Sequence, residues 1–192
     1  MEPSASESAI LIENLQSAFE GESNAQARYL EFARKADEES WHGIASLFRA
    51  AARAEQIHSA NHARILRQLG GEALCIVPPV EIGTTIENLR FALGNERSEV
   101  ETFYPEFLQQ ARECRDVTAI RAFMWAYEAE KSHARIFLDA IECMESQDPD
   151  SWPHSQKEFC VCPICGVVRH GEDEMEMCGV CHCAWSRFER VR

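Results

Sequence analysis

Glu55-Gln56-Ile57-His58 and Glu130-Lys131-Ser132-His133 are two copies of one Glu-x-x-His pattern, and each follows a further glutamate, Glu22 or Glu96, by 33 or 34 residues. Residues three apart on a helix point to the same side, so each half of the repeat offers two carboxylates and one imidazole to a common centre. This is the donor set of a two-metal carboxylate site inside a four-helix bundle. The repeat therefore predicts an all-α bundle of four helices that binds two metal ions.

The first two helices are expected over residues 7–38 and 44–69, where apolar side chains recur at steps of three and four. Gly70-Gly71 is a typical helix stop after the second of these. The connector from Gly70 to Gly83 is too long for a tight helical hairpin, so we expect a crossover that runs the length of the bundle.

The third helix is expected to begin at Thr84, where Glu87 three residues later completes a capping box. The spacing places Phe103 on its inner face. Pro105 removes one backbone hydrogen-bond donor, so a bend is expected there before the helix continues to about residue 113. Asp116 is the expected cap of the fourth helix.

Composition and charge narrow the function classes. The chain has 192 residues, enough for one domain of about 150 residues and a small appendage. A formal net charge of −13 argues against nucleic acid as a partner, because phosphate binding needs basic side chains. Residues 1–8 contain no basic stretch followed by an apolar run, and no segment approaches the roughly 20 apolar residues of a membrane span. We therefore expect a cytoplasmic protein with no membrane partner.

Six of the nine cysteines crowd between residues 160 and 183, beyond a polar, proline-interrupted stretch. That stretch predicts a linker at 147–158, which divides a bundle domain at 1–146 from a small metal-ribbon domain at 159–192. Two Cys-x-x-Cys knuckles, separated by 12 residues, predict a tetrahedral four-sulfur site for iron or zinc. Its ligands are Cys162, Cys165, Cys178 and Cys181.

The glutamates of the bundle lie on apolar seams, and burying them without cations costs several kcal/mol per charge, as an order of magnitude. They must therefore be exposed, protonated or coordinated, and coordination is the only option that suits all of them. Bridging carboxylates with imidazoles favour iron or manganese. The alternative is a structural bundle with polar defects in its seams.

Several short motifs together resemble rubrerythrin, and the similarity covers nearly the whole chain in the same domain order. The motifs are Phe19-Glu20-Gly21-Glu22-Ser23, Glu55-x-x-His58, Glu96-x-x-Glu99 followed by Phe103-Tyr104-Pro105, Glu130-x-x-His133, and the four-cysteine module.

The resemblance implies a ferritin-like bundle that holds two non-haem irons, with Glu55 and Glu130 bridging them. It also implies that Glu22 binds the first iron and that Glu96 and His133 bind the second. The first iron is further bound by Glu99 when it is ferric and by His58 when it is ferrous. Such an exchange is chemically reasonable, because ferric iron prefers an anionic oxygen donor and ferrous iron accepts a neutral nitrogen. His62, Tyr29 and Tyr127 are expected to support the ligands or the core.

For the cysteine module the resemblance implies one iron in a rubredoxin-like site. The sequence departs from the usual rubredoxin pattern at Val167, where an aromatic residue is usual, and at Gly179, where a proline is usual. Cys160 and Cys183 flank the knuckles symmetrically and are interpreted first as spectators, with a redox pair or alternative ligands as other possibilities. A zinc ribbon that only folds the tail is the alternative for the whole module.

The function implied is a diiron peroxidase that reduces hydrogen peroxide to water, with electrons relayed through the rubredoxin-type iron from a reductase or rubredoxin. A homodimer is implied as well, in which the module of one subunit faces the bundle of another. One rival is a ferritin-like ferroxidase that uses oxygen to handle iron. Another is a sensor or interaction protein with a zinc ribbon. The residues leave open the donor and the choice between peroxides and oxygen.

Overall fold

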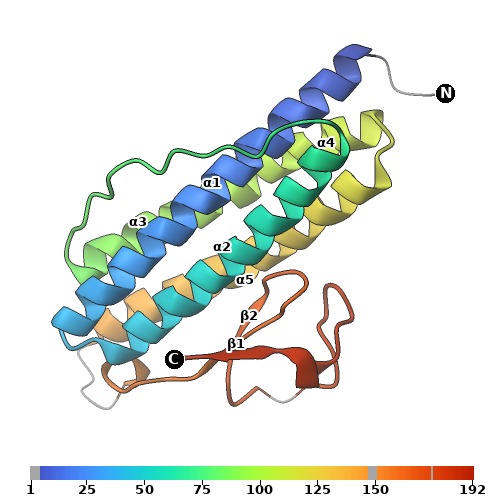
Figure 1. The fold of residues 1–192 in the computed structure, drawn as a ribbon. Helices are drawn as coiled ribbons and strands as arrows, with labels where there is room; N and C mark the ends of the chain where they lie inside the picture. The colour runs from blue at the N-terminus through green and yellow to red at the C-terminus, as the bar shows by residue number, and fades with distance from the viewer. Residues whose placement is uncertain (1–4, 147–150, 174) are drawn as a thin grey trace.

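The computed structural model describes residues 5–146, 151–173 and 175–192. Two long helices and a third, α5, lie side by side, and a fourth rod made of three successive helical segments completes the bundle (Figure 1). The elements of the bundle are α1 (Ala5–Glu38), α2 (His42–Gln68), α3 (Thr85–Ser98), η1 (Glu99–Phe103), α4 (Tyr104–Glu113) and α5 (Val117–Glu145). The predicted four-helix, ferritin-like arrangement is confirmed.

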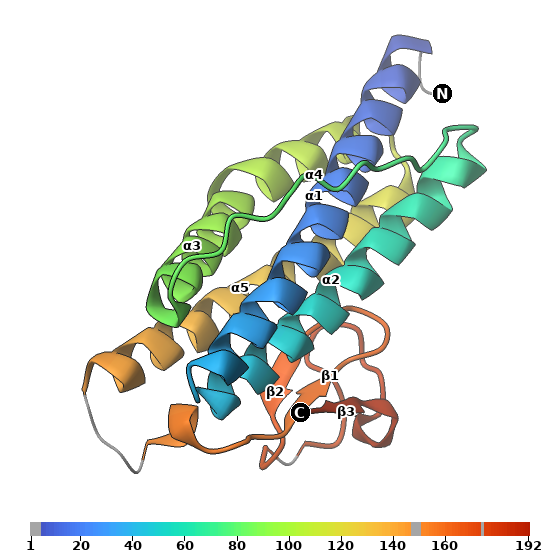
Figure 2. The same ribbon diagram turned by 60° about the vertical axis from the view of Figure 1, so that its left-hand side comes forward.

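The predicted helix ends are also confirmed. After α2, Gly70 adopts a φ of 86°, and the N–H of Gly71 donates to the carbonyl of Leu66 at 2.9 Å. The chain then crosses the length of the bundle without regular structure before α3 (Figure 2). Thr84 and Glu87 form the capping box at the start of α3. Asp116 caps α5 by accepting hydrogen bonds from two backbone N–H groups.

The rod made of α3, η1 and α4 differs from the prediction in the residues before Pro105. Residues 99–103 form a π-helical turn, in which the N–H of Tyr104 donates to the carbonyl of Glu99, five residues back. Such a turn holds one extra residue, so the downstream side chains rotate by roughly 100° about the helix axis. The expectation that Phe103 faces inward was therefore wrong: Phe103 is 47% exposed, and Tyr104 is buried in its place.

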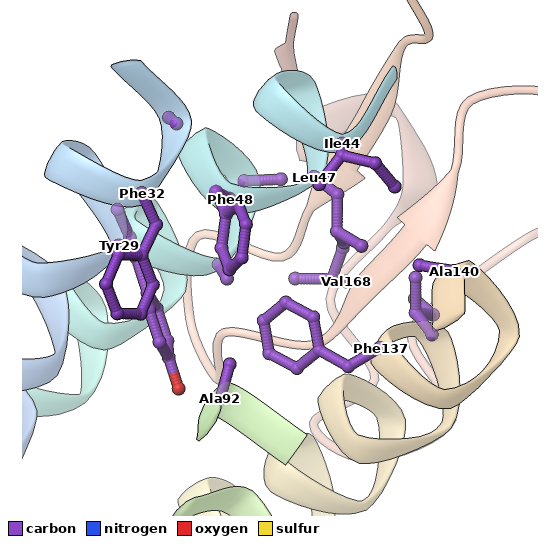
Figure 3. Packing of buried hydrophobic residues seen from close by; sticks show 14 of the residues in the cluster. Tyr29, Phe32, Ile44, Leu47, Phe48, Ala92, Phe137, Ala140 and Val168 are labelled. Atoms are coloured by element: carbon purple, nitrogen blue, oxygen red, sulfur yellow. The ribbon is translucent and has the colours of Figure 1, made fainter. Parts of the chain in front are cut away.

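The core at one end of the bundle is built from aromatic and aliphatic side chains of all four rods (Figure 3). Tyr29, Phe48 and Phe137 form an aromatic group with ring centroids 5.6–5.9 Å apart. Val168, which belongs to the C-terminal module, is part of the same buried cluster (Figure 3). Bundle and module thus share a hydrophobic core.

The C-terminal module contains a small antiparallel sheet in the order β2-β1-β3, with β1 (Phe159–Val161), β2 (Val168–His170) and β3 (Glu189–Val191). A short helix, η3 (Trp185–Arg187), precedes β3. The module lies against α2 and α5 (Figure 2). Arg53 of α2 makes a two-pronged ion pair with Glu189 of β3, at 2.6 and 2.8 Å.

The predicted linker packs on the bundle where it is described. Residues 147–150 lie outside the described residues. The following helix η2 (Trp152–His154) packs so closely on α2 that a Cβ at Gly43 would lie 2.3 Å from the carbonyl oxygen of Trp152. The Trp152 indole N–H also donates to Asp139 at 3.0 Å. The domain boundaries at 146 and 159 stay a prediction.

Among the described helices, none combines the length and the apolar character needed to cross a membrane.

Candidate metal centres

Six of the seven predicted ligands of the bundle converge at its centre as two overlapping groups. In each group the four donor atoms lie within 4.8 Å of one another. The groups are Glu22, Glu55, His58 and Glu130, and Glu55, Glu96, Glu130 and His133. All six side chains are at most 2% exposed. The structure thus brings the two halves of the sequence repeat together around one buried centre.

Glu55 and Glu130 belong to both groups. The two carboxylate oxygens of Glu130 lie 2.8 Å from Nδ1 of His58 and 2.6 Å from Nδ1 of His133. The two oxygens of Glu55 lie 2.9 and 3.5 Å from the same two nitrogens. Each of these carboxylates therefore spans the two halves, which is the position expected of a bridging ligand.

The two imidazoles are held from outside by the first knuckle of the cysteine module. Nε2 of His58 lies 3.0 Å from the carbonyl oxygen of Cys165, and Nε2 of His133 lies 3.0 Å from that of Gly166. A carbonyl oxygen only accepts, so in both rings Nε2 carries the proton that is donated. The lone pair of a neutral ring then lies on Nδ1, which points at the carboxylates.

This arrangement fits bound cations. Both Nδ1 atoms and most of the surrounding carboxylate oxygens are buried without a hydrogen-bond partner, including both oxygens of Glu55 and Glu130. Lone pairs on nitrogen and oxygen that face each other at 2.6–2.9 Å repel unless a proton or a metal ion lies between them. Carboxylates and imidazoles at such spacing are donors suited to iron.

Without a metal, protons take the place of the cations. Burial raises the pKa of Glu22 from 4.5 to about 7, and the charge of Glu130 adds to this effect. Burial also raises the pKa of Glu96 well above its ordinary value. Burial disfavours charge on His58 and Glu130 alike, but their mutual attraction dominates: it raises the pKa of His58 and keeps that of Glu130 well below its usual range.

Two tyrosines hold the outer carboxylates. Tyr29 of α1 donates to Glu96, and Tyr104 donates to Glu22. His62 lies behind Tyr104, with its Nε2 atom 3.2 Å from the hydroxyl oxygen. The supporting role expected of Tyr29 and His62 agrees with these contacts. Tyr127 instead lies under the ammonium of Lys131, 3.9 Å from its ring centroid.

Tyr104 is the residue that sequence reasoning missed. It lies eight positions after Glu96, which in a regular α-helix is roughly 80° away from the inner face. The π-helical turn returns it to that face. The only available signal was its place in the Phe103-Tyr104-Pro105 motif, which by itself does not predict such a turn.

Glu99 is the one predicted bundle ligand outside both groups. Its carboxylate accepts a hydrogen bond from the Asn95 side chain at 2.9 Å. It lines a cavity of about 250 Å³ together with Glu22 and Tyr104. His58, by contrast, lies inside the first group.

The four predicted cysteines of the module also come together. Sγ of Cys162 lies 3.4 Å from Sγ of Cys181, and Sγ of Cys165 lies 3.5 Å from Sγ of Cys178. A tetrahedral site with metal–sulfur bonds of about 2.3 Å requires sulfur–sulfur distances of roughly 3.7 Å, so the arrangement fits one metal ion. Cys160 and Cys183 are not part of this four-sulfur group.

The two knuckles differ in their surroundings. Cys162, Cys165 and Cys178 are completely buried, and Cys181 is only partly so. The first knuckle faces the two imidazoles of the bundle. Gly166, with a φ of 76°, permits this approach, because a Cβ there would lie 2.3 Å from Nε2 of His58. In the second knuckle, a Cβ at Gly179 would have no neighbour within 4 Å.

Known proteins share both the sequence and the arrangement. A family model described as Rubrerythrin matches residues 13–141. Rubrerythrin-2 of Clostridium acetobutylicum is 33% identical over 184 residues, which cover 94% of this chain and 96% of the relative. Nigerythrin of Nitratidesulfovibrio vulgaris is 34% identical over 172 residues, covering 88% of this chain and 81% of the relative.

Solved structures agree. Fully reduced, all-ferrous nigerythrin matches with a TM-score of 0.83 and 32% identity, over 94% of this chain and 86% of that one. A Desulfovibrio desulfuricans bacterioferritin, 21% identical, matches with a TM-score of 0.69 over 79% of this chain and 92% of that one, and shows the shared fold alone. The buried carboxylate and imidazole groups fit a diiron centre, and the four cysteines fit a rubredoxin-like iron site. The chain belongs to the rubrerythrin family.

Proposed function

We propose that the chain is a peroxidase that reduces hydrogen peroxide to water, and that its four-cysteine module supplies the electrons. The observation that carries this proposal is the contact between Cys165 and Gly166 of the module and the two imidazoles of the bundle, at 3.0 Å each. When bound, the iron pair supplies the two electrons that break the O–O bond. A purely iron-storing bundle has no use for an electron-donating module placed at this point.

The protein groups around the centre support this chemistry in three ways. Burial of the six ligands shields the centre from bulk water except on the side where the cavity reaches Glu22. The carbonyls of the first knuckle fix the orientation and the tautomer of His58 and His133. Tyr104 keeps its proton, because burial and the charge of Glu22 raise its pKa well above 10, and its hydroxyl lies beside the cavity that reaches Glu22. This proton is donated to Glu22, so Tyr104 holds that carboxylate in place at the inner end of the cavity.

The role of each ligand stays part of the proposal. Glu55 and Glu130 would hold both irons, as their contacts with both imidazoles support. Glu22 and His58 would hold one iron and Glu96 and His133 the other, and Glu99 would take the place of His58 when the iron is ferric. Cys162, Cys165, Cys178 and Cys181 hold the single iron of the module.

An anaerobic rapid-mixing experiment tests the reaction. The fully reduced protein is mixed with hydrogen peroxide in one series and with oxygen in another, and the absorbance of the oxidised bundle is followed. We expect oxidation by peroxide to be faster than oxidation by oxygen at equal concentration. Faster oxidation by oxygen, with many irons retained per chain, would instead establish a ferroxidase. Zinc in the module with slow peroxide turnover would establish a zinc-ribbon protein.

The knuckle contact has its own test. Gly166→Ala would place a Cβ against His58 in a backbone conformation that disfavours alanine, so it should separate module and bundle. We expect steady-state peroxide turnover to fall by about tenfold, while the first turnover of the reduced protein is largely kept. Gly179→Ala, in the other knuckle, is the matched control. Cys165→Ser should likewise block electron supply and spare the first turnover. Equal losses in Gly166→Ala and Gly179→Ala would contradict the relay.

The partners and the cellular location also belong to this proposal. An electron-donating reductase or rubredoxin is the expected protein partner, and a homodimer or larger homo-oligomer is the expected assembly. In this structure the module contacts the bundle of its own chain, whereas the resemblance implies contact across subunits. A relay is possible in either arrangement. The cytoplasmic location stays a prediction.

A further inference from the structure

A cavity of about 250 Å³ opens to the surface between α1 and the rod that contains the π-helical turn. Ser17, Gly21 and Phe103 are exposed at its mouth. Glu22 and Tyr104, both at most 2% exposed, form its inner end. The cavity therefore leads from solvent to the Glu22 side of the metal centre.

The cavity is larger than hydrogen peroxide requires. Its volume corresponds to about eight water molecules at roughly 30 Å³ each, whereas hydrogen peroxide has only two heavy atoms. The lining combines apolar and polar groups. Ala18, Phe103 and Phe107 supply apolar surface, Glu22 and Glu99 supply carboxylates at the metal end, and further polar groups come from Asn24, Arg28 and Asn95. Such a lining suits a ligand with both a polar and an apolar part.

Gly21 keeps the mouth open. It lies inside the 34-residue helix α1, where glycine costs about 1 kcal/mol of stability relative to alanine. Close packing does not require glycine, because a Cβ there would have no neighbour within 4 Å. Its helical backbone also lacks the positive φ that favours glycine. The space that a side chain would occupy is part of the cavity.

We propose that this cavity binds the organic group of an organic hydroperoxide, which the chain reduces to an alcohol and water. The hydroperoxide O–O bond breaks, and two electrons and two protons are taken up. The electrons come from the reduced centre, so this inference rests on the proposed peroxidase function. Phe103 and Phe107 contact the organic group, while the O–OH end points toward Glu22 and Glu99.

The test compares cumene hydroperoxide with hydrogen peroxide in single-turnover oxidation of the reduced, full-length protein. Gly21→Leu fills the mouth of the cavity and is compatible with a helix. We expect it to lower the cumene hydroperoxide rate at least about tenfold more than the hydrogen peroxide rate, since the larger substrate needs the space. Gly94→Leu is the matched control, because Gly94 is also an exposed helical glycine with no neighbour within 4 Å, but lies outside the cavity lining. It should leave both rates unchanged.

A binding measurement separates this inference from the proposed function. Saturation-transfer NMR detects binding of 2-phenyl-2-propanol, the alcohol product, to the oxidised iron-loaded protein without any reaction. Binding to wild type and Gly94→Leu but not to Gly21→Leu would support the cavity as the site. Rapid oxidation by hydrogen peroxide with no alcohol binding, or with equal rate losses for both peroxides in Gly21→Leu, would overturn this inference alone. Failure of both peroxides to oxidise the reduced protein would overturn the peroxidase function itself.

Discussion

The two halves of the bundle site use the same residue types at nearly the same spacing, but their surroundings differ. The Glu96 half lies beside the larger aromatic core, where Tyr29 both packs against Phe48 and donates to Glu96. The Glu22 half borders the cavity, and a second carboxylate, Glu99, lines the same cavity. Its supporting tyrosine, Tyr104, directly follows the π-helical turn.

From this difference we infer different tasks for the two halves under the proposed function. A ligand set enclosed by core side chains is held in one geometry, since closely packed interiors resist movement. The half beside the cavity has space for a carboxylate to approach and for a substrate to enter. We therefore assign the anchoring role to the Glu96 half and the reactive role to the Glu22 half.

The largest expected effect comes from removing a carboxylate that both halves share. Glu130→Ala takes away the group that contacts both imidazoles, so iron binding by the bundle should be lost in both halves. The metal-free protein should also lose about 3–5 kcal/mol of unfolding free energy, because buried charges lose their partner. Iron analysis and urea denaturation measure the two effects. Retention of one bundle iron would show that the halves bind independently.

A pH effect on the metal-free protein should be the next largest. Burial raises the pKa of Glu22 to about 7 in the folded chain, above its unfolded value of 4.5, so the folded state binds more protons across this interval. Stability should therefore fall as the pH rises from 4.5 to 7. Iron affinity should rise over the same interval, because the ligands must lose their protons. Urea denaturation of metal-free protein as a function of pH measures the slope; a rising stability would contradict it.

A pair of matched substitutions distinguishes the two halves by their iron affinity. Glu96→Gln removes a donor of the enclosed half and should weaken ferrous binding there by about a hundredfold. Glu99→Gln should change ferrous affinity by less than about threefold, because Glu99 lies outside both donor groups, and should weaken ferric binding instead. Titration of iron in both oxidation states distinguishes the two. Equal ferrous losses in both variants would remove the distinction between the halves.

The smallest effect is expected from the supporting tyrosines. Tyr104→Phe and Tyr29→Phe each remove one hydrogen bond to an outer carboxylate, and each should weaken iron binding by about tenfold. Only Tyr104→Phe should also slow oxidation by peroxide, because Tyr104 borders the cavity and Tyr29 does not line it. Rapid mixing measures both variants. A similar slowing by Tyr29→Phe would mean that the two halves react alike.

The sequence predicted those features that follow from regular periodicity. These features depend on local rules of helix geometry. The structure confirms the cap at Asp116 and the stop at Gly70 and brings the six predicted donors together, and their roles as ligands stay a prediction. The inner position of Tyr104 was missed, because one π-helical turn shifts the register of the residues that follow it. The cavity was missed as well, since it results from the absence of a side chain at Gly21 and from the meeting of distant elements.

The periodicity of the sequence could not predict the contact between module and bundle, and the reason is a different one. A polar linker sets how far the module reaches but not where it packs. The packing depends on Val168 in the shared core, on the pairing of Arg53 with Glu189, and on the room left by Gly166. These are long-range contacts that no local pattern encodes.

The electron relay from module to bundle is tested most directly by following both together after one addition of peroxide. The fully reduced protein is mixed anaerobically with one equivalent of hydrogen peroxide, and the absorption of the oxidised bundle and of the iron–thiolate module is recorded over time. We expect the bundle to be oxidised first and the module to be oxidised afterwards, as the bundle signal declines. A module that stays reduced while the bundle stays oxidised would contradict the claim that the knuckle at Cys165 and Gly166 supplies the electrons.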